Sequence, residues 1–126
     1  MSQSQLDILL EGLEAGSLLT EQTFSELDAD QYLDIRDAND DEWITASKRW
    51  ELDADGSDVE ESEQIHAGRE QAFKQAFRLT GNHDLAGYIS DDIRLICMAL
   101  RQDGGEDPVI KHMLSSYLQG QLPLLS

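Results

Sequence analysis

Apolar residues recur at helical spacing along most of the chain. The first predicted helix covers residues 5–15, and it rests on leucines at positions i, i+3, i+4 and i+7, which fall on one helical face: Leu6, Leu9, Leu10 and Leu13. Thr20 is predicted to open a second, short helix, with Phe24 on its buried side.

The pattern is less regular over the next segment, because aspartates interrupt it. Residues 27–35 are predicted to form a loop or short turn, with a brief extended piece where Leu33 and Ile35 alternate with Asp. A third helix is predicted from a cap at Asn39 to a stop at Gly56.

The longest helix is predicted to begin at the sequence S-x-x-E of Ser57 and Glu60, which is typical of a capping box, and to run to Leu79. Its expected inner stripe consists of residues at helical spacing: Ile65, Ala72, Phe73, Ala76 and Phe77.

Three further segments follow. A short helical turn is predicted over 85–88, and a helix capped by Ser90 over 91–101. The second of these is apolar on most sides, so we expect it to be central, with Ile96 and Cys97 nearly inaccessible. A last helix is predicted to open at Asp107 and to end before Gly120.

The fold class that these elements predict is all-α, a single compact bundle of about six helices. At 126 residues, with 40% hydrophobic residues, the chain is long enough for one core, and we expect one domain over 1–126. The core is expected between the helices that carry 73–77, 93–100 and 110–118.

Charge changes the picture more than composition does. The formal net charge is −17, and residues 1–63 hold 19 acidic against 3 basic side chains, whereas residues 64–126 hold 7 against 6. Such an acidic N-terminal half indicates a basic partner. It argues against direct contact with nucleic acid or an anionic membrane, since both select Lys and Arg.

No run of about 18 apolar residues is present, so no membrane span is predicted. The first residues lack the basic and apolar regions of a signal peptide, and the single Cys97 has no partner for an internal disulfide. A cytoplasmic location is therefore expected.

Two short segments of the sequence resemble parts of metal sites. Residues 51–56 resemble the middle of a calcium loop, but Ser62 stands where the bidentate Glu is required. Glu63 and His66 have the spacing of a di-iron ligand pair, without the second copy that such a site needs. We therefore predict no metal and no cofactor.

Catalytic signatures are also missing from the sequence. The chain has no phosphate loop, no G-x-G-x-x-G and no H-E-x-x-H, and Cys97 lies in an apolar helix where a thiol is inert. We expect a protein that is not an enzyme.

The favoured function is an acidic binding protein that occupies a basic surface of a protein partner, as inhibitors and immunity proteins do, with nucleic-acid mimicry as a narrower variant. The alternative is a small accessory protein whose acidity reflects solubility or adaptation to salt, which the presence of only three lysines fits.

The expected partner-binding residues are acidic or aromatic and belong to the acidic half of the chain: Asp28, Asp30, Asp34, Asp37, Trp43, Trp50, Asp53, Asp55 and Asp58. For the two tryptophans, anchoring in the core and exposure in the interface are both open. The C-terminal residues 122–125 are expected either to pack on the core or to form an exposed apolar hook.

Overall fold

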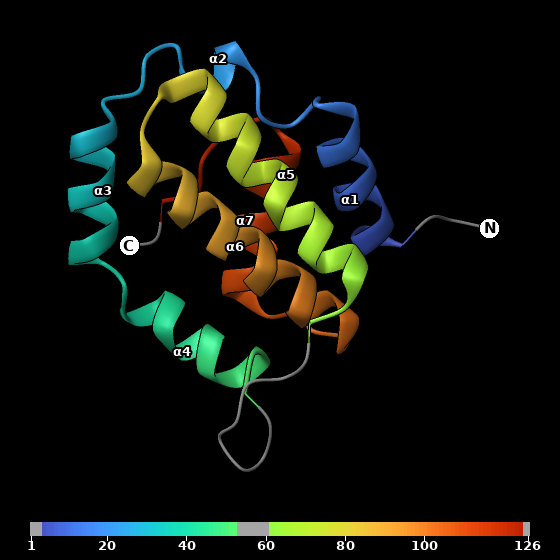
Figure 1. Ribbon diagram of the computed structural model, residues 1–126. Helices are drawn as coiled ribbons and strands as arrows, with labels where there is room; N and C mark the ends of the chain where they lie inside the picture. The colour runs from blue at the N-terminus through green and yellow to red at the C-terminus, as the bar shows by residue number, and fades with distance from the viewer. Residues whose placement is uncertain (1–3, 53–60, 125–126) are drawn as a thin grey trace.

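The computed structural model describes residues 4–52 and 61–124, and the regular elements in these ranges are seven helices (Figure 1). This confirms the predicted all-α bundle. The helices are α1 (Gln5–Ala15), α2 (Glu21–Phe24), α3 (Ala29–Ala38), α4 (Asp41–Trp50), α5 (Glu63–Thr80), α6 (His83–Arg101) and α7 (Pro108–Leu118).

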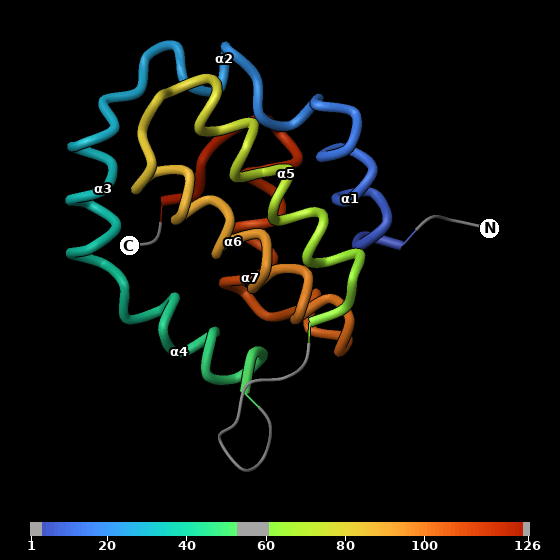
Figure 2. Tube along the Cα trace, viewed as in Figure 1, coloured from blue at the N-terminus to red at the C-terminus, as the bar shows by residue number. Residues whose placement is uncertain are grey.

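Helix α6 is the centre of the bundle. It packs against α1, α4, α5 and α7, and its most extensive partner is α5. Ile93, Ile96 and Cys97 on α6 are all fully inaccessible, which confirms the central position and the burial predicted for this segment. Helix α3 lies at the edge of the bundle, as the chain trace shows (Figure 2).

Several predicted helix ends are confirmed by their caps. The Ser4 hydroxyl accepts a hydrogen bond from the backbone N–H of Asp7 at 3.1 Å, and Gly16 ends α1 with a left-handed φ of 74°. The Asp107 carboxylate caps α7, whose first residue is Pro108.

The loop predicted over residues 27–35 is wrong, because these residues largely belong to α3. Asp28 is the N-cap of this helix and accepts from the N–H of Gln31 at 3.1 Å. Asn39 ends α3 and does not open α4, which starts at Asp41. The inward face of α3 carries Tyr32 and Arg36, so its amphipathic pattern is concealed by a buried arginine.

The segments predicted over 85–88 and 91–101 are one helix of 19 residues, and Ser90 is buried inside it instead of capping it. Asn82 supplies the true cap by accepting from the N–H of Leu85 at 3.0 Å. Helix α5 begins after Ser62, which accepts from the N–H of Ile65 at 3.2 Å. The predicted box at Ser57 and the stop at Gly56 lie outside the described residues.

The inner stripe of α5 also needs a correction. Ile65, Ala72 and Ala76 are buried, but the Phe77 side chain is 44% exposed and Phe73 is only partly buried. The small side chains face the core because α5 and α6 pack closely there, which leaves the bulky rings on the flank of α5.

Among the described residues, no helix combines the length and the apolar character that crossing a bilayer requires.

Candidate functional site

Helix α3 presents a row of carboxylates. Asp30, Asp34 and Asp37 are exposed and follow one another at i, i+4 and i+7, so they share the outer part of one helical face. Tyr32 and Arg36 are buried on the opposite side of α3. Because their burial fixes the rotation of the helix about its axis, the three aspartates face outward.

Helix α6 faces this row with a second one. Asp84, Tyr88 and Asp91 are also spaced at i, i+4 and i+7. The space between the two rows is a groove of about 740 Å³, which we call the α3–α6 groove. Its lining residues come from these two helices: Asp30, Leu33, Asp34, Asp37, His83, Asp84, Gly87, Tyr88 and Asp91.

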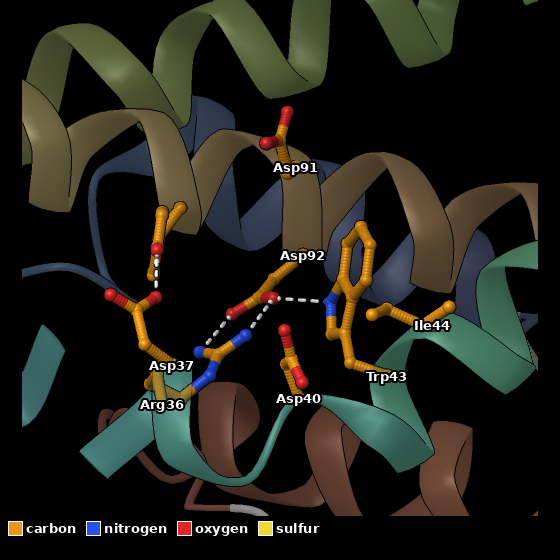
Figure 3. Close-up of a pocket in the computed structure, with 8 residues that line it drawn as sticks. Arg36, Asp37, Asp40, Trp43, Ile44, Asp91 and Asp92 are labelled. Carbon is orange, nitrogen blue, oxygen red and sulfur yellow. Dashed lines mark hydrogen bonds and ion pairs between the residues drawn. The ribbon is translucent and has the colours of Figure 1, made fainter. Parts of the chain in front are cut away.

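A smaller pocket of about 190 Å³ adjoins the groove and shares Asp37, Tyr88 and Asp91 with it (Figure 3). We call it the Trp43 pocket. It combines carboxylates with apolar and aromatic walls, and its lining residues are Arg36, Asp37, Asp40, Trp43, Ile44, Tyr88, Asp91 and Asp92.

Behind the pocket, the fully buried Asp92 binds three side chains from three helices. Arg36 donates two hydrogen bonds to it, at 2.9 and 2.7 Å, and the Trp43 indole N–H donates a third at 2.8 Å. Figure 3 shows Arg36 and Trp43 reaching Asp92 from opposite sides. The Tyr117 hydroxyl donates the fourth hydrogen bond at 2.6 Å.

This network is electrically balanced. Burial alone would lower the pKa of Arg36, but its hydrogen bonds and attraction to Asp92 raise that pKa above the usual value. Burial raises the pKa of Tyr32 to about 12, and burial together with the charge of Asp92 raises that of Tyr117. Both tyrosines therefore stay neutral and act as hydrogen-bond donors, and the positive charge of Arg36 is compensated by Asp92.

The carboxylates at the surface of the site are less fully compensated, although Asp37 accepts a hydrogen bond from the Tyr88 hydroxyl and the charges of Arg69 and Arg94 act on Asp91. Within the described residues, no Lys, Arg or His forms an ion pair with Asp30, Asp34, Asp40, Asp84 or Asp91. Partial burial and the nearby charge of Asp92 raise the pKa of Asp91. A cation placed near Asp91 would lower this electrostatic cost.

The two tryptophans differ in position. Trp43 lines the pocket and is also packed against the core through its contact with Asp92. Trp50, at the other end of α4, donates its indole N–H to Asp107 at 2.9 Å and is not among the residues that line the groove or the pocket.

Of the aspartates predicted to bind a partner, the structure brings Asp30, Asp34 and Asp37 together in the groove. Asp28 is exposed at the N-cap of α3, two residues before Asp30, and does not line the groove. The other three, Asp53, Asp55 and Asp58, lie outside the described residues.

The sequence reasoning missed the contribution of α6 to this site. Asp84, Tyr88 and Asp91 meet α3 only through the tertiary fold, since more than forty positions separate them from it. For Asp92 a signal was present: it falls between Ile89 and Ile96 on an apolar stripe, and a carboxylate in such a place requires a buried partner.

The C-terminal segment packs on the core as far as it is described. Leu122 is partly buried, Pro123 is buried, and the carbonyl of Pro123 accepts a hydrogen bond from the Tyr32 hydroxyl at 2.7 Å. Leu124 is 52% exposed. The tail thus supports the inner side of α3.

Metal binding finds no support in this geometry: the part of the chain that the structure describes contains no group of three or more His, Cys, Asp or Glu side chains placed to hold an ion. The calcium-like string at 51–56 lies mostly outside the described residues.

Comparison with protein families identifies the family of this chain. The family model described as "Immunity protein PIM1" matches residues 8–124, which include nearly all of the seven helices. None of the curated proteins compared with the chain matches it. Because the family match covers most of the sequence, the chain belongs to the immunity protein PIM1 family, and its role is of the immunity type, exercised on a protein partner.

Proposed function

We propose that the protein neutralises a toxin by laying the α3–α6 groove against a basic surface of that toxin. The observation that carries this proposal is the double row of acidic residues, from Asp30 to Asp37 on α3 and from Asp84 to Asp91 on α6, whose aspartates form no ion pair with a Lys, Arg or His of the described residues. The proposed action is stoichiometric binding, includes no catalytic step, and takes place in the cytoplasm.

The Trp43 pocket suits a single long cationic side chain. The aliphatic stem of a Lys or Arg would lie against Ile44 and Trp43, while its charge would face Asp37 and Asp40. Desolvated pairs of this kind dominate binding energy when an aromatic wall excludes water around them. The carboxylates of the wider groove would increase the rate of association with a basic surface, and this rate would fall as salt is added.

The proposed interface therefore centres on Asp30, Asp34, Asp37 and Trp43, with Asp28 at its margin. Trp50 and the acidic residues Asp53, Asp55 and Asp58 stay predictions for the same interface, and their contribution depends on how far the toxin extends along α4.

The test begins with the toxin that the protein captures from its source cell, expressed with and without the protein. Growth arrest by the toxin alone, and rescue by coexpression, establish neutralisation. Asp34→Lys should weaken capture at least tenfold and abolish rescue, because it places a like charge against the basic surface. Glu11→Lys on α1 makes the same change of charge away from the groove, and we expect it to leave capture unaltered.

A steric variant tests the groove without changing its charge. A side chain at Gly87 would extend into open space, since apart from its chain neighbours and the surrounding backbone of α6 no heavy atom lies within 4 Å of a Cβ added there. Gly87→Leu should therefore obstruct the groove and impair capture, whereas Gly87→Ala should not. Equal capture by both, together with insensitivity to salt, would contradict the proposal. Displacement of the toxin by added DNA would instead favour nucleic-acid mimicry.

A further inference from the structure

Beside the groove lies a cluster of three rings, Phe73, Phe77 and His83, which we call the aromatic patch. The phenylalanine rings stack with centroids 6.3 Å apart and an interplanar angle of 6°. The His83 ring stands edge-on to both, at 5.3 Å from Phe73 and 6.3 Å from Phe77. Phe77 is 44% exposed, although its spacing in the sequence predicted it on the inner stripe of α5.

The aromatic patch continues the proposed interface. His83 also lines the α3–α6 groove, as does Asp84, the next residue of α6. A molecule that covers the groove from α3 to α6 therefore reaches Phe77 across the His83 ring. Aromatic residues next to a charged, solvated margin are the typical composition of a binding hot spot.

We propose that the aromatic patch is a second anchor of the toxin-binding surface and takes an apolar side chain, preferably aromatic, that the toxin carries beside its basic residues. This inference rests on the proposed function of the groove. A second copy of the chain does not fit as the occupant, because it would bring its own acidic groove towards this one and the like charges would repel each other.

Two acetylated peptides, Lys-Lys-Phe-Lys-Lys and Lys-Lys-Ala-Lys-Lys, serve as probes in NMR titrations at low salt. Both should perturb the amide signals of the groove. The phenylalanine peptide should bind about two- to tenfold more tightly, the range expected for one added aromatic pair, and should also shift the signals of Phe77 and His83.

Phe77→Ala should abolish this preference for the phenylalanine peptide. Ile8→Ala is the matched control, since Ile8 is an apolar residue of similar exposure, 40%, on α1. Phe77→Leu keeps an apolar side chain and should retain part of the preference for the phenylalanine peptide. This variant separates the loss of the apolar contact from a loss of stability, which Phe77→Ala could also cause.

An equal preference in wild type and in Phe77→Ala would overturn the inference and leave the groove proposal intact. Absence of binding by both peptides would overturn the groove proposal, and the inference with it. A dimer in sedimentation that Phe77→Ala dissociates would also overturn the inference, because the occupant would then be a second copy.

Discussion

Arg36 and Asp92, 56 positions apart in sequence, form a buried ion pair with two hydrogen bonds of 2.9 and 2.7 Å. The pair joins α3 at the edge of the bundle to α6 at its centre. It thereby sets the distance between the two carboxylate rows that form the groove, and it leaves the surface of the groove with a net negative charge.

Removing Asp92 should strongly destabilise the protein. Asp92→Ala leaves the Arg36 charge and the donors of Trp43 and Tyr117 without their acceptor, so the free energy of unfolding should fall by about 3–5 kcal/mol. Urea denaturation, monitored by circular dichroism, measures this loss in the free energy of unfolding. Asp91→Asn, one residue away on the exposed side, should not lower stability, because the raised pKa of Asp91 shows that its charge is disfavoured. A loss below about 1 kcal/mol for Asp92→Ala would contradict the structural role assigned to the pair.

Two glycines should respond to alanine in opposite directions. Gly87 lies within α6 and has open space at its Cβ position, so Gly87→Ala should raise stability by about 0.5–1 kcal/mol through helix propensity.

At Gly104 a Cβ would lie 2.8 Å from the carbonyl oxygen of Ala99 and 2.9 Å from the Trp50 ring, so Gly104→Ala should cost about 1–3 kcal/mol. Thermal unfolding measures the melting temperatures of the two variants in parallel. A similar change of melting temperature in both would show that the surroundings of at least one of the two glycines differ from those described.

Acid should destabilise the junction between α4, α5 and α6. Burial would raise the pKa of Glu61, but its hydrogen bond with Arg94 and the charge of Arg69 lower it below the usual value. A carboxyl group with a lowered pKa in the folded state stabilises the protein above its unfolded-state pKa, and this contribution is lost as the pH falls through the folded-state value.

Glu61→Gln should therefore reduce the urea midpoint at pH 7, and the difference from wild type should shrink at about pH 3. Glu11→Gln, at an exposed position in the middle of α1 without a described ion pair, serves as the control and should have little effect at either pH. A constant difference across this range would mean that the charge of Glu61 is not the origin of the effect.

Cys97 should be unreactive in the native protein. Its side chain is fully buried, and burial, with a smaller effect from Glu61, raises the pKa of the thiol to about 12. Labelling with a thiol reagent should proceed only at the rate of unfolding and should accelerate in urea. Rapid labelling of the folded protein would show that α6 opens locally.

Local sequence determined the elements wherever the cause of structure is local. Ser4 with Gly16 and Asp107 with Pro108 mark helix ends through backbone hydrogen bonds within a few residues, and the apolar residues around Ile96 predicted a central helix because burial needs apolar surface on every side. The charge polarity of the chain likewise pointed to a partner-binding protein, in agreement with the immunity family.

Only the tertiary structure decided which of these features meet. Residues 27–35 were predicted as a loop because aspartates interrupt the apolar pattern there. Most of these residues form a helix because Arg36, which follows them on its inward face, can be buried favourably when Asp92 is opposite. Phe77 was predicted to be inside because its spacing is right, but the space between α5 and α6 is filled by Ala72 and Ala76. The groove itself has no local signature: its two walls acquire their shared negative field only when α3 is held against α6.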